Sequence, residues 1–264
     1  MDSRAEHRHD GGGCAVSGRS VAVVAAAGAA TDPVLGALAD AGVSPGVETI
    51  PPAEVTAATL GDARVIVAVG EPALLAVGRS APDPPVVPVD TGTGRYDVSA
   101  ASIGAAVDAA VADTIETVDH PVLGVSVADE RAGTALLDVT LVTADPARIS
   151  EFAVGAGDGW TESIRADGVV IATPTGSTGY ARAVGAPVLA PGTGLVAAPV
   201  SAYAMHVRPW VLRPPVSLSV ERDEARVTLR LDDEVTRPVP PGVPVGVAVD
   251  ASVSLVVPEQ FGGE

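Results

Sequence analysis

Two uninterrupted apolar runs near the N-terminus constrain the fold of this chain more than any other feature of its sequence. They cover Val21–Ala27 and Arg64–Val69, and the helix-like pattern Pro33–Ala41 lies between them. A shorter apolar run at Pro85–Val89 and a candidate helix at Ala100–Ala112 follow. Strands that are apolar on both faces are typical of parallel sheets with helices packed on each side. The first part of the chain is therefore predicted to be an α/β layered domain.

The second part of the chain has a different pattern. From about His120 onward, short apolar runs alternate with Gly and Pro turns, which is typical of a β domain of the sandwich type. We expect a boundary between residues 100 and 118, which gives an α/β domain at 21–115 and a β-rich domain at 116–258, with a return of the C-terminal strands to the first domain as an open alternative. Residues 1–20 are Gly-rich and polar and are predicted to be a disordered tail. The predicted strands are Pro121–Val127, Leu136–Val142, Val169–Ala172, Leu195–Ala198, Val216–Val220, Ala225–Leu231, Val245–Val249 and Val253–Val257.

The charge of the chain makes several classes of function unfavourable. It has 33 acidic residues against 16 basic ones, all of them Arg, and a net charge of −17. The lack of Lys excludes Schiff-base, PLP-lysine and Walker-A lysine chemistry, and the negative charge disfavours nucleic-acid binding by counterion release. An acidic surface without Lys suits a halophilic cytoplasm, where carboxylates keep the surface hydrated. An ordinary acidic cytosolic protein is the alternative.

The cysteine and histidine content and the hydropathy pattern exclude further classes of function. The single Cys14 excludes an internal disulfide and a thiolate zinc cage and indicates a reducing compartment. Outside the predicted tail, only His120 and His206 remain, too few for a His-rich metal site. The apolar run Val21–Ala30 is shorter than the ~18–20 residues of a membrane span, and acidic residues precede it where a signal peptide is basic. We therefore expect a cytoplasmic protein that does not bind membranes.

The most informative stretch is Ala166–Tyr180, which reads ADGVVIATPTGSTGY. A predicted strand at Val169–Ala172 runs into a loop of Thr, Pro, Gly and Ser, and then into the start of a helix. Small hydroxyl residues and glycines beside a helix N-terminus expose backbone N–H groups that suit a polar or anionic ligand. A helix cap that follows a Pro-Thr-Gly turn would use the same residue types. On these grounds alone both interpretations stay open.

This stretch resembles the signature of the NAD kinase family, which combines a strand, the tripeptide aDG and the run TPTGSTAYslSAGGPi. The similar residues here are Ala166–Gly168, Thr173–Tyr180 and Ala183–Val188. A second block of that family, a strand ending in proline followed by an Arg-Pro-apolar strand, is similar to Pro199–Ser201 and Arg208–Leu212. Both blocks keep their order and spacing, so chance agreement is improbable.

The resemblance implies a reaction, a fold and partners. The reaction is phosphorylation of the 2′-hydroxyl of the adenosine ribose of NAD(H) to give NADP, with ATP or polyphosphate as donor and Mg²⁺ or another divalent cation accompanying the donor. The implied fold is an N-terminal Rossmann-like α/β domain followed by a C-terminal β-sandwich-like domain. A homodimer or homotetramer that binds a small-molecule dinucleotide is the implied assembly.

The resemblance also carries the dinucleotide-binding positions of the family onto this chain. Asp167 stands where the family has a carboxylate that contacts the dinucleotide, and Arg148 and Arg165 stand where it often has a basic or polar contact. An exposed Arg is more often a solvated charge, which remains the alternative for both. The other implied binding residues are Thr175, Gly176, Ser177, Thr178, Gly179, which replaces the usual Ala, Tyr180 and Ala183.

Two further blocks depart from the family pattern. The catalytic loop GGDGT is expected after the second apolar run, where this chain reads Gly70-Glu71-Pro72. Glu71 takes the place of the Asp that activates the ribose hydroxyl, Gly70 is an implied binding residue beside it, and Pro72 deletes a backbone N–H that could reach a phosphate. The Asn-Glu pair that holds the adenosine ribose aligns with Leu137-Asp138, and a leucine cannot supply the hydrogen bonds of an amide.

These departures keep several functions open. A positioned general base contributes about 10²–10⁴ in rate, so an altered loop predicts weakened or altered turnover. The leading interpretation is an NAD kinase-like protein. The alternatives are a catalytically impaired NAD(P)-binding paralogue with a regulatory role, a kinase of the same superfamily for another polyol or nucleotide, and an acidic β-rich domain in which the TPTGST loop is only a turn.

Overall fold

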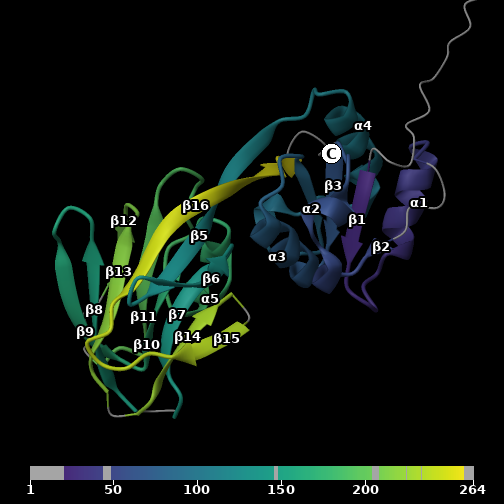
Figure 1. The fold of residues 1–264 in the computed structure, drawn as a ribbon. Coiled ribbons are helices and arrows are strands. Elements are labelled where there is room, and N and C mark those ends of the chain that lie inside the picture. The colour runs from purple at the N-terminus through teal and green to yellow at the C-terminus, as the bar shows by residue number, and fades with distance from the viewer. Residues whose placement is uncertain are drawn as a thin grey trace, which may run out of the picture.

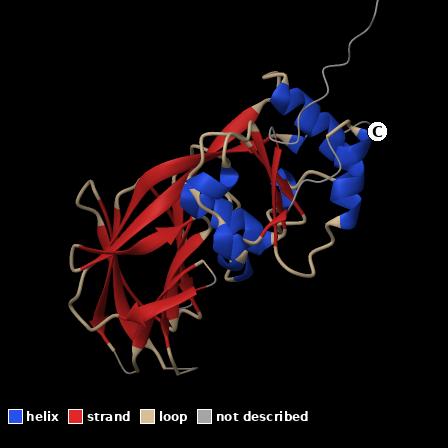
Figure 2. Ribbon diagram, turned by 45° about the vertical axis from the view of Figure 1, so that its right-hand side comes forward, coloured by secondary structure: helices blue, strands red, loops and turns tan. Residues whose placement is uncertain are grey.

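The structure is a computed structural model that describes residues 21–43, 49–145, 148–203, 208–223, 225–232 and 234–258. Within these ranges the chain forms one sheet of ten strands and one of six. The larger helices gather around one end of the ten-stranded sheet (Figures 1 and 2). The tail predicted at residues 1–20 lies outside the described residues.

The N-terminal part is an α/β layered structure. Parallel strands β2, β1, β3 and β4 lie side by side in that order. Helices α1 and α4 pack on one face of them, and α2 and α3 pack on the other, so every residue of β1 and β3 is buried. This burial on both faces is the physical reason for the uninterrupted apolar runs. The elements are β1 (Val21–Ala25), α1 (Asp32–Asp40), β2 (Thr49–Ile50), α2 (Ala57–Leu60), β3 (Val65–Val69), α3 (Glu71–Ser80), β4 (Val86–Val89) and α4 (Ile103–Val111).

Two long strands continue the same sheet into the second part of the chain. Strand β16 (Val245–Val256) pairs in parallel with β4, through Leu255 and Val86, and antiparallel with β5 (Thr117–Val127) along its whole length. Figure 1 shows β16 spanning the two ends of the molecule. The remaining strands of this sheet are β6 (Glu130–Ala135), β8 (Ser150–Ala156), β9 (Thr161–Ala166) and β13 (Val216–Arg222).

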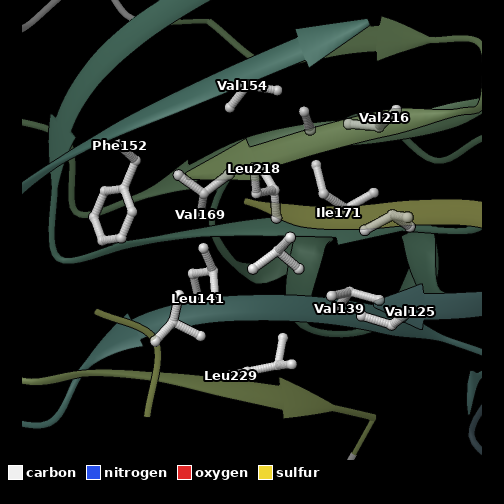
Figure 3. Packing of buried hydrophobic residues seen from close by; sticks show 14 of the residues in the cluster. Val125, Val139, Leu141, Phe152, Val154, Val169, Ile171, Val216, Leu218 and Leu229 are labelled. Carbon is white, nitrogen blue, oxygen red and sulfur yellow. The ribbon is translucent and has the colours of Figure 1, made fainter. Parts of the chain in front are cut away.

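The six-stranded sheet is antiparallel and faces the second half of the first sheet. Its order is β12-β11-β10-β7-β14-β15. The two sheets bury a common core, in which Phe152, Val154 and Leu218 of one sheet meet Leu141 and Ile171 of the other (Figure 3). Each fully buried side chain of this size contributes about 1.5–3 kcal/mol. The strands are β7 (Asp138–Thr143), β10 (Gly168–Ala172), β11 (Leu195–Val200), β12 (Trp210–Leu212), β14 (Val227–Leu231) and β15 (Glu234–Pro238).

The predicted combination of an α/β part and a β-sandwich part is present in the structure. The strand predicted at Pro121–Val127 begins at Thr117 in the structure. The residues before Pro121 are mostly polar and leave no apolar run in the sequence, but they pair with β16 over a partly exposed stretch. Strands β6 and β9 were not predicted, since most of their side chains are exposed or half-buried and leave no apolar run. In the part of the chain that the structure describes, no helix is long and apolar enough to cross a membrane.

Candidate functional site

A cleft lies where the α/β part meets the six-stranded sheet. It contains a cavity of about 180 Å³, and a second cavity of about 420 Å³ adjoins it along β7 and β14. The two cavities share Asp138, Tyr180 and Asp232 as lining residues. Their combined size is in the range of about 300–1,000 Å³ that is typical of small-molecule sites. The first cavity is also lined by Glu71, Thr91, Gly92, Thr93, Leu137, Thr175, Gly176, Thr178 and Gly179.

The turn before β7 is held from both sides by side chains of other strands. The carboxylate of Asp232 accepts hydrogen bonds from three consecutive backbone N–H groups, at 3.0 Å from Leu136, 2.7 Å from Leu137 and 3.1 Å from Asp138. On the opposite side, the Thr173 hydroxyl donates to the carbonyl of Leu136 at 2.7 Å, and the Thr173 N–H donates to the carbonyl of Leu137 at 2.9 Å. This double attachment places Asp138 at the wall of the cleft.

Gly176 is required at its position by close packing. A Cβ atom there would lie 2.0 Å from the carbonyl oxygen of Leu137, far inside van der Waals contact. The Gly176 N–H also donates to the Thr173 hydroxyl at 3.1 Å. The loop after β10 therefore lies flush on the turn before β7, and only a residue without a side chain allows this approach.

Two hydroxyl groups of the same loop anchor it to its surroundings. Ser177 is fully buried and accepts a hydrogen bond from the backbone N–H of Leu189 at 2.9 Å. The Thr175 hydroxyl shares a hydrogen bond of 2.5 Å with Nδ1 of buried His120, and the His120 ring packs edge-on against Tyr96 of the α/β part at 4.5 Å. Thr175 thus lines the cleft while its hydroxyl ties the loop to the neighbouring layer, and Ser177 does not line the cleft.

Tyr180 is the aromatic side chain of the cleft. It begins the short helix α5 (Tyr180–Ala183) and is 43% exposed, which is high for a large apolar residue. Partial burial raises the pKa of its phenol, and the negative charges of Asp138 and Asp167 add to this effect. An exposed ring beside a cleft can stack on a flat ligand such as a nucleotide base.

Asp138 is a buried carboxyl group with an unusual titration. Burial raises its pKa to about 7, against a hydrogen bond of 3.0 Å from the Thr140 hydroxyl that lowers the pKa. The nearby carboxylates of Asp232 and Glu71 raise the pKa further, and Arg230 lowers it. Near neutral pH this group can therefore either accept or donate a hydrogen bond.

Glu71 opens helix α3 at the end of strand β3. Gly70 precedes it with a φ of +86° and donates its N–H to the carbonyl of Val89 at 2.8 Å, which ties the ends of β3 and β4 together. The Glu71 carboxylate lies against Gly92, where an added Cβ would be 3.7 Å from its Oε2 atom. Pro72 fits the first turn of α3 sterically, but it has no N–H to offer a ligand.

Positive charge in the cleft comes from β14. Arg230 lines the second cavity together with Thr140 and Val142 of β7. Thr140 and Arg230 are paired residues of neighbouring strands and point away from the sandwich core, into which Val139 and Leu141 point. Among the residues that line the two cavities, Arg230 is the single cation.

Several residues implied by the resemblance lie outside this cleft. Asp167 is half-buried at the opposite end of β10 from the TPTGST loop, although its charge still reaches Tyr180. Arg165 is exposed on β9, and its guanidinium lies 5.3 Å from the ring centre of Tyr203. Arg148 is exposed in the connection between β7 and β8, and Ala183 is exposed at the end of α5. Gly70, Glu71, Asp138, Thr175, Gly176 and Thr178–Tyr180 are brought together at the cleft or directly beside it.

Other cleft residues were not predicted from the sequence. The turn Thr91–Thr93 begins one residue after the predicted strand Pro85–Val89, and its Thr-Gly alternation at the carboxyl end of a parallel strand was a usable signal. Thr140, Arg230 and Asp232 gave no comparable signal, because their positions depend on the pairing of β7 with β14. Among the residues that the structure describes, no group of three His, Cys, Asp or Glu could hold a metal ion.

The chain is similar in sequence to known proteins. Residues 136–253 match the family of the ATP-NAD kinase C-terminal domain. The chain is 34% identical over 161 residues to an NAD kinase of Methanosarcina barkeri, which covers 52% of this chain and 58% of that protein. It is also 34% identical over 135 residues to an NAD kinase of Methanosarcina acetivorans, covering 47% and 49%. The chain therefore matches about half the length of these curated relatives.

Solved structures have the same fold. The yeast NADH kinase complexed with NADH has a TM-score of 0.70 at 13% identity and covers 90% of this chain and 83% of that one. An NAD kinase from Archaeoglobus fulgidus in complex with ATP has a TM-score of 0.69 at 22% identity, with coverages of 91% and 95%. These likenesses confirm the predicted fold class, an α/β part followed by a β-sandwich. We conclude that residues 136–253 match the ATP-NAD kinase C-terminal domain and that the described chain has the fold of these NAD kinase structures.

Proposed function

We propose that this protein binds NAD(H) in the cleft and transfers a phosphoryl group from ATP or polyphosphate to the 2′-hydroxyl of its adenosine ribose, giving NADP. The observation that carries this proposal is the convergence of Glu71, Asp138 and Tyr180 on one cavity. They supply a candidate base, a group that can hydrogen-bond ribose hydroxyls, and a ring that can stack on a base.

The transfer step follows from the position of Glu71. The oxygen of the 2′-hydroxyl forms a bond to the terminal phosphorus of the donor, and the bond from that phosphorus to the leaving phosphate oxygen breaks. The hydroxyl proton passes to the Glu71 carboxylate, which lies at the wall of the cavity beside Gly92. Phosphoryl transfer depends mainly on positioning and on charge stabilisation, and this geometry supports the positioning part.

The other cleft residues bind and orient. Asp138 accepts or donates a hydrogen bond at a ribose hydroxyl, and Arg230 provides the positive charge that a dinucleotide phosphate requires in an otherwise acidic cleft. A divalent cation carried by the donor would neutralise the phosphate charges.

The experiment that tests this function is a turnover assay in molar KCl. Purified protein is incubated with NAD or NADH and with ATP or polyphosphate, and the formation of NADP or NADPH is measured. We expect product with at least one donor, and loss of product in the Glu71→Gln variant, which keeps the shape of the side chain without the base. Absence of NAD binding by calorimetry would refute the proposal as a whole.

A catalytically impaired NAD(P)-binding protein is the second candidate, and two observations favour it. Pro72 removes a donor from the first turn of α3, where the N–H groups of Ala73 and Leu74 already donate to the carbonyl of Gly70. Leu137 brings an apolar side chain to the cavity wall, and part of it packs against the core beneath α3. Tight binding of NAD or NADP without turnover under any donor would favour this function.

We further infer the setting in which the protein works. The net charge of −17 and the lack of Lys support a cytoplasm of high salt, because carboxylates keep a surface hydrated there. The family resemblance supports a homodimer or homotetramer. Light scattering in molar KCl would measure that assembly, and a monomer would contradict it.

A further inference from the structure

Asp232 occupies an unusual place at the end of β14. It has a φ of +52°, in the left-handed region that Asp and Asn enter more readily than other non-glycine residues. Its own N–H donates to the carbonyl of Asp138 at 2.9 Å, which continues the pairing of β14 with β7 by one more bond. Hydrogen bonds of the short polar side chain stabilise a residue in this conformation.

The Asp232 carboxylate accepts hydrogen bonds from three backbone N–H groups. One oxygen, Oδ2, accepts from Leu136, and the other, Oδ1, accepts from both Leu137 and Asp138. Successive backbone N–H groups that point to one spot form an anion-binding concavity. Here the chain fills that concavity with its own carboxylate, contributed from a residue about a hundred positions later in the sequence.

We infer that Asp232 is the positioning residue of the cleft: its carboxylate fixes the turn Leu136–Asp138 and thereby aims the Asp138 carboxyl group at the bound ribose. This role deepens the proposed function and rests on it for the identity of the ribose. It does not require Asp232 to touch the substrate, because the effect is transmitted through the turn. The Thr173 side, which binds the carbonyls of the same turn, completes the clamp.

Asp232 also acts on the titration of Asp138 through its charge, whether or not a ligand is bound. Four charged or titratable side chains from the surrounding elements act on Asp138 or are acted on by it: Asp232 and Glu71 raise its pKa, Arg230 lowers it, and Asp138 in turn raises the pKa of Tyr180. The Thr140 hydroxyl is its hydrogen-bond donor. Removing the Asp232 charge therefore favours the ionised form of Asp138.

The variant that tests this is Asp232→Asn. Asparagine tolerates a left-handed turn, but its amide offers one acceptor oxygen where the carboxylate offers two, and its NH₂ group would face one of the backbone N–H donors. The matched control is Asp129→Asn. Asp129 is exposed in the turn between β5 and β6 and also has a positive φ, +64°, so this control removes the same charge from a similar backbone conformation.

Two measurements on the full chain in molar KCl separate a positioning role from a merely structural one. Carboxyl carbon NMR follows the titration of Asp138, and calorimetry measures the affinity for NAD. We expect Asp232→Asn to lower the titration midpoint of Asp138 and to weaken NAD binding by at least about tenfold. Asp129→Asn should change neither.

A second variant keeps the test decisive if the first does not fold. Asp232→Glu retains the charge, but its longer side chain cannot accept from all three N–H groups in the same geometry. It should weaken NAD binding without lowering the midpoint of Asp138. Wild-type affinity in every folded variant would overturn the inference, even if the wild type binds NAD. Failure of the wild type itself to bind NAD would instead refute the proposed function, while the titration of Asp138 would still test the role of Asp232.

Discussion

Replacing Gly176 by alanine tests whether the two loops of the cleft depend on their contact. The new methyl carbon would lie 2.0 Å from the carbonyl oxygen of Leu137 and 2.4 Å from its carbonyl carbon. Both atoms are backbone, so no side-chain rotation can relieve the overlap. The loop after β10 must therefore move away from the turn before β7, and the hydrogen bonds between them must lengthen.

The size of the effect follows from the bonds at this contact. The Thr173 hydroxyl donates to the carbonyls of Leu136 at 2.7 Å and Leu137 at 3.2 Å, and the Thr173 N–H donates to the carbonyl of Leu137 at 2.9 Å. Each such bond is worth about 1 kcal/mol, and overpacking of a rigid site costs about 1–3 kcal/mol more. The substitution should thus destabilise the protein by about 4–6 kcal/mol. For a chain of this size, that corresponds to a fall in Tm of roughly 10–20 °C.

The assay is thermal unfolding by circular dichroism in molar KCl, together with calorimetric titration of NAD below the transition. The control is Gly36→Ala on helix α1, where an added Cβ meets nothing within 4 Å; it should raise stability by about 0.5–1 kcal/mol through helix propensity. If Gly176→Ala melts within about a degree of the wild type, the packing argument for this glycine is wrong.

Three further predictions concern pH, salt and the altered loop. Between pH 3.8 and about 7, folding takes up a proton at Asp138. The contribution of Asp138 to stability is therefore complete below that range and is lost as pH rises through it. Asp138→Asn should remove this pH dependence, up to about 4 kcal/mol, from urea-unfolding profiles, and parallel profiles would contradict the burial effect. Lowering KCl from molar to millimolar should lower the Tm, because the screening length grows from about 3 Å at 1 M to about 30 Å at 0.01 M; an unchanged Tm would remove the argument for halophilic adaptation. Glu71→Asp combined with Pro72→Gly should raise NADP formation by at least about tenfold, more than either change alone. Further addition of Leu137→Asn should lower KM. A brisk wild type with a slower double variant would mean that the loop is already adapted to Glu71 and Pro72.

Much of the α/β part could be predicted because strands that are buried on both faces appear in the sequence as uninterrupted apolar runs. The runs at Val21–Ala27 and Arg64–Val69 contain β1 and β3, and the pattern Pro33–Ala41 contains most of α1. The β part was less readable, since strands such as β6 and β9 have half-exposed or alternating side chains. The run Val245–Val249 and most of the separate run Val253–Val257 belong to one continuous strand, β16. Between them Asp250 forms a bulge, and Ala251 and Ser252 pair with β5 although they are half-buried or exposed.

In the candidate site too, residues of one contiguous motif could be predicted from the sequence, and residues brought together only by strand pairing could not. Residues in one contiguous motif, such as Gly176 and Tyr180, could be expected to lie close together, and both line the first cavity. Asp232 could not be assigned, because its partners Leu136 and Leu137 come from a distant part of the sequence and only strand pairing brings them together. Asp167 and Ser177 belong to the same motif, but Asp167 lies at the far end of β10 and Ser177 is buried, so their predicted binding roles stay predictions.

Because β16 pairs with both β4 and β5, the ten-stranded sheet can be completed only at a late stage of synthesis. Strand β4 leaves the ribosome long before residues 245–256 exist, so its outer edge has no partner until β16 is made, after every other described strand. Until then the nascent chain exposes the backbone edges of β4 and of the long strand β5, which are templates for pairing with other chains. A translation product that stops before residue 245 would therefore be prone to aggregate, although its α/β segment is complete in sequence.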